Sequence, residues 1–291
     1  FFSCKTSAYG GGGVYFDYTG NYQCVMSKIC AFGCSCNHDG QFAFIYLNNS
    51  ANHKNHFNDS TIAHSLKNGK SPWDSVYLLS DTILFPSNNF TNNECYRGSA
   101  FACDPLRSST SETCWISYCS VVNNTANGGY NCIRFWSSSS SSTHRIDTCN
   151  IINNKQTTTT QGTIYAYTNI LFKDSCILGN DEGKTFFYFY SSSYKITVSN
   201  CTIDNTRYTG GGSVILTQTI KRSFIHALSH IVTRSCDSYF DSYGTLTAKP
   251  IVPSRSSRFY MSCNNQKPMI DPSRSMEFIF LLTMLPSNPI N

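Results

Sequence analysis

The sequence predicts an all-β protein, a right-handed parallel β-helix of about eight to nine rungs with a proline-rich C-terminal cap or tail. Three observations predict this class. Charged residues make up 13% of the 291 residues and aromatic residues 14%, which excludes both long charged helices and a disordered chain. Two short phrases rich in β-forming residues recur along the chain. The copies of the first phrase lie 25 to 31 residues apart, which is the length of one solenoid repeat, and the second phrase shares this period.

The first phrase begins with a cysteine or a small polar residue, continues with alternating β-forming residues and ends on asparagine. Its clear copies start at Cys119, Cys149, Cys176 and Cys201, and weaker copies start at Cys30, Ser60, Asn88 and Ser229. Alternation with a period of two is typical of strands that bury one face. We expect the four cysteines of the clear copies to occupy equivalent positions in successive rungs. Their thiols should be buried, and the spacing between rungs disfavours a chain of disulfides.

The second phrase is a glycine followed by an aromatic or aliphatic strand. Its copies start at Gly13, Gly40, Gly98, Gly129, Gly162, Gly183 and Gly212. One period has room for about three short strands with turns between them, so each strand can pair with its copy in the next coil. Leucine-rich repeats are excluded because their Leu-x-x-Leu-x-Leu pattern is absent. A β-propeller is excluded because each blade needs about 40 residues or more.

Together the two phrases resemble the right-handed β-helix repeats of polymorphic-outer-membrane-protein-like surface proteins. The resemblance covers about residues 4–245. Cysteine mostly stands where that family has the phenylalanine of its Phe-x-x-Asn phrase, and the family's Gly-Gly-Ala-Ile phrase is degenerate here. The resemblance implies a secreted, membrane-associated or surface-displayed protein, with adhesion and host contact as its roles.

Two regions are expected, a β-helix over residues 1–249 and a cap or irregular tail over residues 250–291. Most of the prolines follow Lys249, and proline is excluded from central strands. We expect Met276–Leu285 to cover the open end of the last rung or to begin a truncated anchor. The apolar run within it is too short to span a membrane, which takes about 20 residues. The chain opens on Phe1 with no signal peptide, as expected of a chain whose leader is removed or of a fragment.

The candidate ligand-binding residues are Tyr167, Phe186, Tyr188 and Tyr190. Residues 186–190 are five consecutive aromatic residues. If Phe187 and Phe189 fill the core, the other three face outward. Counted from Gly162 and Gly183, Tyr167 and Tyr188 take the same offset and should stack on adjacent rungs. Exposed aromatic side chains of this kind bind sugars or partner proteins, and the alternative is a ladder that only stabilises the sheet.

Glycosylation candidates are the five Asn-x-Ser/Thr sites at Asn48, Asn58, Asn89, Asn123 and Asn200. A chain this rich in Asn, Ser and Thr contains about as many by chance, so these sites are not evidence of secretion. The net charge of +5 is spread thinly, and nucleic acid is therefore not an expected partner.

No metal and no cofactor are predicted. Cysteines 24, 30, 34 and 36 with His38 are irregularly spaced for zinc, which favours packing or a disulfide. The histidine pairs 53/56 and 226/230 are interpreted as surface polar groups.

No catalytic residues are predicted either. Enzymes of the pectin-lyase-like β-helix type need converging carboxylates or a calcium site, and the paired acids here are only Asp181-Glu182 and Asp237/Asp241. We therefore expect a non-catalytic scaffold, at the cell surface or extracellular, that binds a glycan or a host or cell-surface protein. Contact with a membrane would require an anchor outside these residues. The alternatives are a carbohydrate-active lyase or hydrolase on the same scaffold, and a structural or antigenic coat protein without a specific ligand.

Overall fold

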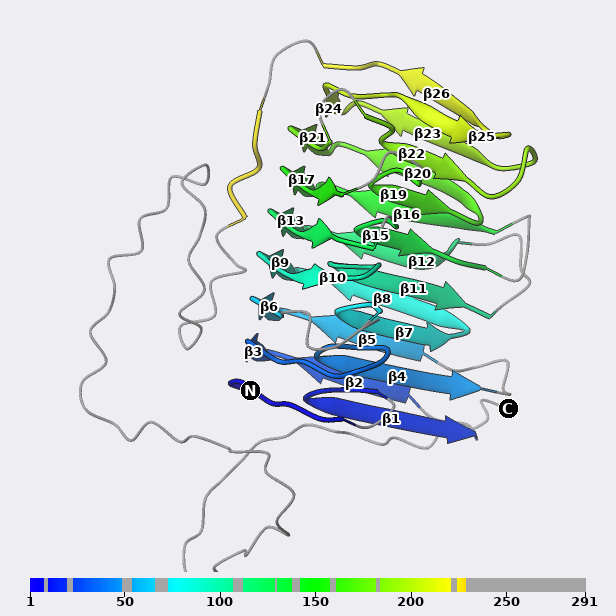
Figure 1. The fold of residues 1–291 in the computed structure, drawn as a ribbon. Coiled ribbons are helices and arrows are strands. Elements are labelled where there is room, and N and C mark those ends of the chain that lie inside the picture. Colours follow the sequence, from blue (N-terminus) through cyan, green and yellow to red (C-terminus); the bar gives the residue numbers. More distant parts are fainter. Residues whose placement is uncertain are drawn as a thin grey trace, which may run out of the picture.

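The fold is a parallel β-solenoid (Figure 1). The computed structural model describes residues 1–7, 10–19, 23–48, 54–65, 73–106, 112–128, 130–137, 142–157, 161–181, 184–220 and 224–228. Within these ranges there is no helix, and the strands of each sheet pair in parallel with their counterparts one coil along. The predicted all-β parallel β-helix is confirmed. The predicted boundary at residue 249 and the cap over residues 250–291 lie outside the described residues.

Four parallel sheets run along the solenoid. The first contains β1 (Val14–Thr19), β4 (Ala43–Asn48), β7 (Val76–Ser80), β11 (Phe101–Pro105), β15 (Ile133–Phe135), β19 (Ile164–Ala166), β22 (Phe187–Phe189) and β25 (Tyr208–Gly210). The second contains β2 (Gln23–Ser27), β5 (Lys54–Asn58), β8 (Thr82–Pro86), β12 (Glu112–Ser117), β16 (Thr143–Asp147), β20 (Asn169–Lys173), β23 (Lys195–Ser199) and β26 (Ser213–Thr217). The third contains β3 (Cys30–Phe32), β6 (Thr61–Ala63), β9 (Asn89–Thr91), β13 (Ser120–Val122), β17 (Asn150–Ile152), β21 (Cys176–Leu178) and β24 (Thr202–Ile203). A short fourth sheet contains β10 (Glu94–Cys95), β14 (Thr125–Ala126) and β18 (Lys155–Gln156).

The core lies inside the coils because alternate residues of each strand point inward. Phenylalanines from different sheets meet there. The ring centroid of Phe85 lies 5.4 Å from that of Phe90 and 4.9 Å from that of Phe101. Every coil thus buries its apolar face on its neighbours, and a single coil could not do so alone.

Two corners of each coil are formed by residues with a positive φ. Between the second and third sheets these residues are Lys28, Asp59, Ser87, Tyr118, Thr148, Asp174 and Asn200. After the third sheet they are Gly33, His64, Asn92, Asn123, Asn153 and Gly179. This conformation favours glycine, asparagine and aspartate, which explains why the first repeated phrase ends on asparagine.

Asparagines that follow the second corner form a buried ladder, which we call the asparagine ladder: Asn93, Asn124, Asn154 and Asn180. In each step the side-chain Oδ1 accepts both the backbone N–H and the Nδ2–H of the preceding member. For Asn124 and Asn154 these two bonds measure 3.0 and 2.9 Å. The Nδ2 group of Asn124 also donates to the carbonyl of Phe90 at 2.9 Å. The amide groups thereby hydrogen-bond one coil to the next.

The first corner has a different ladder, the thiol–hydroxyl ladder, which comprises Ser60, Asn88, Cys119, Cys149, Ser175 and Cys201. Each side chain accepts the backbone N–H of the preceding member; Cys119 N–H, for example, lies 3.4 Å from the Sγ atom of Cys149. Burial raises the pKa of the Cys201 thiol to about 11, so the thiol stays protonated and donates to the carbonyl of Ser199. The predicted burial of the cysteines is confirmed.

The predicted equivalence of Cys176 with the other three cysteines is wrong. Ser175 takes the ladder position, and Cys176 is the first residue of β21, where it pairs with Asn150. Cys119 and Cys149 are 30 residues apart, whereas Cys149 and Ser175 are 26 apart, so Cys176 lies one residue past the ladder position. The side chain of Cys176 packs outside the core, under residues 224–228, which run beside β17 and β21 (Figure 1).

Candidate functional site

The outer face of the first sheet is lined with aromatic side chains. The outward-facing side chains of its strands form two columns that run along the solenoid. The residue between them on each strand points inward. At the N-terminal end, Tyr15, Phe44 and Tyr77 stack in order, with ring centroids 5.3 and 5.2 Å apart. Such cross-strand stacking stabilises the sheet and leaves ring edges toward solvent.

The largest group of aromatic side chains lies where β15, β19 and β22 end, and we call it the aromatic patch. It comprises Trp136, Tyr165, Tyr167, Tyr188, Tyr190 and Tyr194. The rings of Trp136 and Tyr167 are parallel within 5°, with centroids 4.4 Å apart. Tyr190 continues the column 4.3 Å from Tyr167. Trp136 is 36% exposed and Tyr190 57% exposed, so both ends of this stack reach solvent.

A second row supports the exposed stack. The ring of Tyr188 lies 5.4 Å from that of Tyr165, and Tyr194 lies 5.6 Å from Tyr167. Tyr165 and Tyr194 are almost fully buried. Burial raises the pKa of both hydroxyl groups, so they remain protonated and can donate hydrogen bonds.

The structure brings three of the four predicted ligand-binding residues together and moves the fourth into the core. Phe186 was expected to face outward, but it is fully buried. It precedes β22 at a corner where two consecutive side chains point inward, and its ring packs edge-on against Phe187 at 4.4 Å. The expected burial of Phe187 and Phe189 is confirmed.

The predicted stacking of Tyr167 on Tyr188 is wrong by two residues. Tyr165 pairs with Tyr188, and Tyr167 stacks on Tyr190. Counting from the glycines missed this because Gly162 lies two residues before β19, whereas Gly183 lies four residues before β22. Trp136 and Tyr194 were also missed, since neither lies in a repeated phrase. Their only sequence signal is an aromatic residue at the end of a strand or just before one.

Tyr190 is the most exposed ring of the aromatic patch. Phe189 pairs with Gly210, so the next position in the neighbouring coil, above Tyr190, falls to Gly211. Gly211 has no side chain and is itself exposed. Tyr167 contacts the rings of both Trp136 and Tyr190. The centroids of Trp136 and Tyr190 lie 6.4 Å apart, so the three rings form a cluster and not a straight column.

A buried charged cluster lies on the same side of the solenoid, beside Tyr77. Arg134 donates to the fully buried Asp74 at 2.7 Å. Burial raises the pKa of Asp74 to about 6, and Arg134 opposes this rise. Gly98 makes room for the carboxylate, because a Cβ atom there would lie 1.8 Å from Asp74 Oδ1. Arg97 covers the cluster, with its guanidinium 3.3 Å from the ring centre of Trp73.

This cluster resembles a catalytic site because it contains an acid with a raised pKa. Its buried position, however, disfavours contact with a substrate. Asp74 has no exposed surface and Arg134 is 8% exposed. A hydrolase or lyase needs carboxylates that reach the substrate. The cluster therefore favours a structural role, in which Arg134 neutralises a carboxylate buried under the first sheet.

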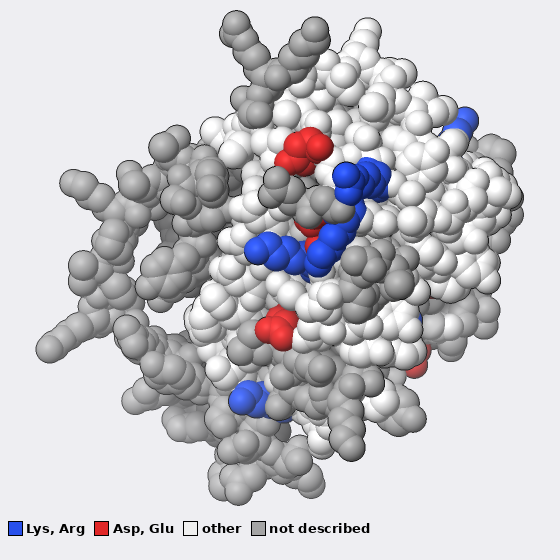
Figure 2. All heavy atoms as spheres, turned by 45° about the horizontal axis from the view of Figure 1, so that its top comes forward, with Lys and Arg blue, Asp and Glu red and all other residues white. Residues whose placement is uncertain are grey.

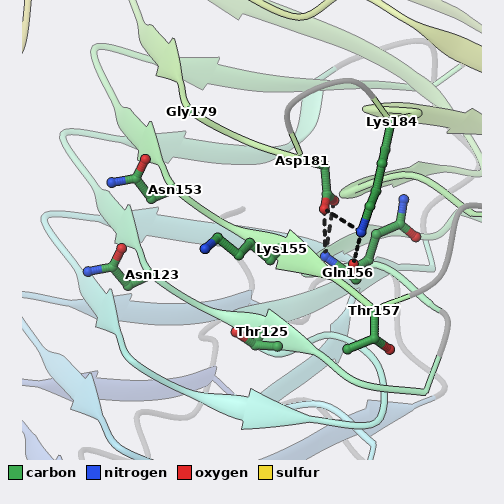
Figure 3. A pocket seen from close by; sticks show the side chains of 9 residues that line it. All are labelled: Asn123, Thr125, Asn153, Lys155, Gln156, Thr157, Gly179, Asp181 and Lys184. Carbon is green, nitrogen blue, oxygen red and sulfur yellow. Dashed lines mark hydrogen bonds and ion pairs between the residues drawn. The ribbon is translucent and has the colours of Figure 1, made fainter.

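A polar groove lies at the fourth sheet, on the outside of the second corner (Figure 3). Its volume is about 750 Å³. It is lined by Asn123, Thr125, Asn153, Lys155, Gln156, Thr157, Gly179, Asp181 and Lys184. In a view tilted by 45° toward the β26 end of the solenoid, charged side chains are few, and basic and acidic ones lie together near the middle of this face (Figure 2).

The predicted glycosylation sites differ in accessibility. Asn123 and Asn200 are exposed at corners with positive φ. Asn58 is half-buried and Asn89 is buried. The side chain of Asn48 lies outside the described residues.

The described residues contain no group of three or more His, Cys, Asp and Glu side chains arranged to hold a metal ion. Cys24, Cys34 and Cys36 are buried free thiols, whereas Cys30 is disulfide-bonded. His56 is half-buried, and the backbone N–H of His226 donates to Asn150 Oδ1. Glu182, Asp237 and Asp241 lie outside the described ranges, as do His53 and His230. The part of the chain that the structure describes has no helix long and apolar enough to cross a membrane.

Comparisons with protein-family models, with curated proteins and with solved structures found no match to this chain. The parallel β-solenoid is therefore established by the geometry of the chain itself. Functional arguments have to start from its surface.

Proposed function

We propose that this protein is a non-catalytic binding scaffold that recognises glycans through the aromatic patch. The observation that carries the proposal is the cluster of Trp136, Tyr167 and Tyr190, in which Tyr190 is 57% exposed. An aromatic ring packs against the apolar C–H face of a sugar, while hydroxyl groups at its edge hydrogen-bond the sugar's own hydroxyls. The tyrosine hydroxyls of the patch supply those donors and acceptors.

The rigidity of the patch supports this proposal. Tyr167 contacts the rings of Trp136 and Tyr190, and the buried Tyr194 packs beside it. A site whose side chains are already ordered loses little conformational entropy when a ligand binds. The solenoid therefore holds Tyr190 and Trp136 in place before any ligand arrives.

A carbohydrate-active enzyme is the less favoured alternative. Burial raises the pKa of Asp74 in the charged cluster, and Asp74 is inaccessible to a substrate. Burial also raises the pKa values of the half-buried Asp39 and Asp104, and the charge of Arg134 opposes both rises. No carboxylate belongs to the aromatic patch as we define it. Binding without chemistry is the role that such a surface favours.

The proposed setting is the cell surface or the extracellular space, with a glycan or a glycosylated host protein as partner. The resemblance of the repeats to polymorphic-outer-membrane-protein-like surface proteins supports this setting. The exposed Asn123 and Asn200 would then be available for glycosylation.

The test is a glycan-array and cell-binding assay on the full chain, followed by titration of any glycan that binds. We expect Tyr190→Ala to weaken binding about 10-fold or more, because one stacked ring contributes roughly 1 to 2 kcal/mol. Tyr15→Ala is the matched control, since Tyr15 is 54% exposed and ends the aromatic column at the other end of the same sheet. Equal binding by wild type and Tyr190→Ala would refute the assignment of the site. Failure of the wild type to bind any glycan would favour the coat-protein alternative.

A further inference from the structure

The disulfide bond at Cys30 joins β3 to a cysteine beyond the described residues. The chain has 15 cysteines, and the described part of it contains 12 free thiols. Apart from Cys30, this leaves Cys236 and Cys263, and both follow Leu228, the last described residue. We infer that Cys30 pairs with Cys236, and that the chain between Leu228 and Cys236 lies as a strap along the outer face of the third sheet. The inference goes beyond the proposed function and does not depend on the aromatic patch.

Cys30 and Asn150 lie in the same column of the third sheet. Cys30 pairs with Thr61, Thr61 with Asn89, Asn89 with Ser120, and Ser120 with Asn150. The side chains of this column point out of the coils, because the next residue of each of these strands belongs to the core. Cys30 and Asn150 are therefore two points on one outward-facing line, four coils apart.

Asn150 already holds residues 224–228 at one end of this line. Its Nδ2 group donates to the carbonyl of His226 at 2.9 Å, and its Oδ1 atom accepts the backbone N–H of His226 at 3.0 Å. Apolar side chains of the segment pack on those of β13, β17 and β21. The segment descends from the β26 end of the solenoid beside β21 and β17 (Figure 1). It therefore heads along the outer face of the third sheet toward Cys30.

The distance to be spanned favours Cys236 over Cys263. Four coil spacings of about 4.8 Å separate Asn150 from Cys30, which makes about 19 Å. Cys236 follows His226 by ten residues, and an extended chain of that length spans up to about 33 Å. Cys263 follows His226 by 37 residues, so its pairing would close a longer loop at a higher cost in conformational entropy.

The column between the two anchors is covered, although it faces out of the coils. Thr61 has no exposed surface, and Asn89 is 4% exposed. In the adjacent outward-facing column, Ala63 and Thr91 are buried as well. Threonine and asparagine are residue types that proteins mostly expose to water. A strap that lies over both columns accounts for their burial.

The bond forms by oxidation of two thiols. Cys30 and Cys236 lose two protons and two electrons as the S–S bond forms, and glutathione disulfide, which accepts them, is reduced to two molecules of glutathione. The 12 free thiols of the described residues are all buried, which disfavours their exchange with this bond. The strap should therefore close in an oxidising compartment and be released by reduction.

The test is disulfide mapping of the full chain, produced without N-glycans, equilibrated with glutathione and glutathione disulfide, and isolated as a monomer. Free thiols are alkylated in denaturant before digestion without reductant. Trypsin cleaves after Arg234 and Arg258, so Cys236 and Cys263 fall in different peptides. We expect mass spectrometry to find the Cys30 peptide joined to the Cys236 peptide, and to lose this pair after reduction. An alkylated Cys30, or Cys30 joined to Cys263 or to any other cysteine, overturns the inference.

The reactivity of Cys176 tests the strap itself. Its thiol is buried under residues 224–228, which the disulfide would hold in place from the far end. Cys30→Ser and Cys236→Ser should each raise the rate at which N-ethylmaleimide alkylates Cys176 in the folded protein about 10-fold, because the segment opens more often. Cys263→Ser is the matched control and should react as the wild type does. Equal rates in all four proteins would overturn the strap, and a rise shared by the core thiols would indicate global unfolding and contradict it as well.

Discussion

The asparagine ladder and the charged cluster both bury polar groups, and they differ in how completely those groups are paired. In the asparagine ladder each member repeats the same hydrogen bonds one coil along, as Asn124 and Asn154 do. In the charged cluster, Asp74 and Arg134 occur once, and Asp74 Oδ1 and Arg134 Nε have no partner. A polar side chain that recurs in every coil finds its hydrogen-bond partner in the same side chain of the next coil. A polar side chain that occurs once depends on one unrelated neighbour. Removing that neighbour should therefore lower the free energy of unfolding more than removing one member of the ladder does.

The largest effect is expected for Arg134→Met. It leaves the Asp74 carboxylate buried without its ion-pair partner, which should lower the free energy of unfolding by about 3 to 5 kcal/mol. Urea denaturation followed by circular dichroism measures this. The double variant Asp74→Leu/Arg134→Met should recover most of the loss, because no uncompensated charge remains. A double variant as unstable as the single one would contradict this explanation.

Acid should destabilise the protein through His144, another polar group that occurs once in the core. Burial lowers its pKa to about 4, against an ordinary value of 6.5. Below pH 6.5 the unfolded chain binds a proton that the folded chain excludes, so stability falls as the pH drops from 6.5 to 4. The loss amounts to about 3 kcal/mol.

His144→Leu should remove this component of the pH dependence, because a leucine does not titrate. Its neighbours in the column, Cys114 and Ile170, are apolar and should accept it. Denaturation at several pH values between 4 and 7 tests the prediction. A decline in stability as steep as that of the wild type would show that other groups cause it.

Asn124→Ala should lower the free energy of unfolding by about 2 to 3 kcal/mol. It removes the acceptor of the Asn93 N–H and the donor to the Phe90 carbonyl, and both groups stay buried. Asn123→Gly is the adjacent control, since the exposed Asn123 is not in the ladder and glycine tolerates its positive φ. We expect it to change stability by less than about 1 kcal/mol. Similar losses in both variants would contradict the ladder assignment.

The smallest effect is expected for Cys149→Ser, below about 1 kcal/mol. A hydroxyl group accepts the N–H of Cys119 as the thiol does, and Ser175 already fills the next position of this ladder. Cys149→Val keeps a similar side-chain volume but removes the hydrogen-bond acceptor. It should therefore lower the free energy of unfolding more than Cys149→Ser does. Thermal unfolding of both variants measures the difference. Equal melting temperatures would show that the thiol only fills space.

Much of the fold could be predicted from the sequence, and less of the candidate sites. The repeated phrases mark corners with positive φ and strands with one buried face, and both are local properties. The position of Cys176 could not be predicted, because the coils differ in length and only the hydrogen bonds show which residue takes the ladder position. The partners of Tyr167 could not be predicted for the same reason, since one strand register decides which rings meet.

The sequence by itself determined that this chain forms a parallel β-solenoid with buried cysteines, because a periodic pattern of strand-forming residues repeats the same local preferences in every coil. Only the tertiary structure decided that Phe186 is buried, that Trp136 joins the aromatic patch, and that Asp74 pairs with Arg134. These contacts join residues from different coils, and their geometry depends on the lengths of the segments between them. A period visible in the sequence specifies the coil, whereas side-chain contacts depend on how the coils align.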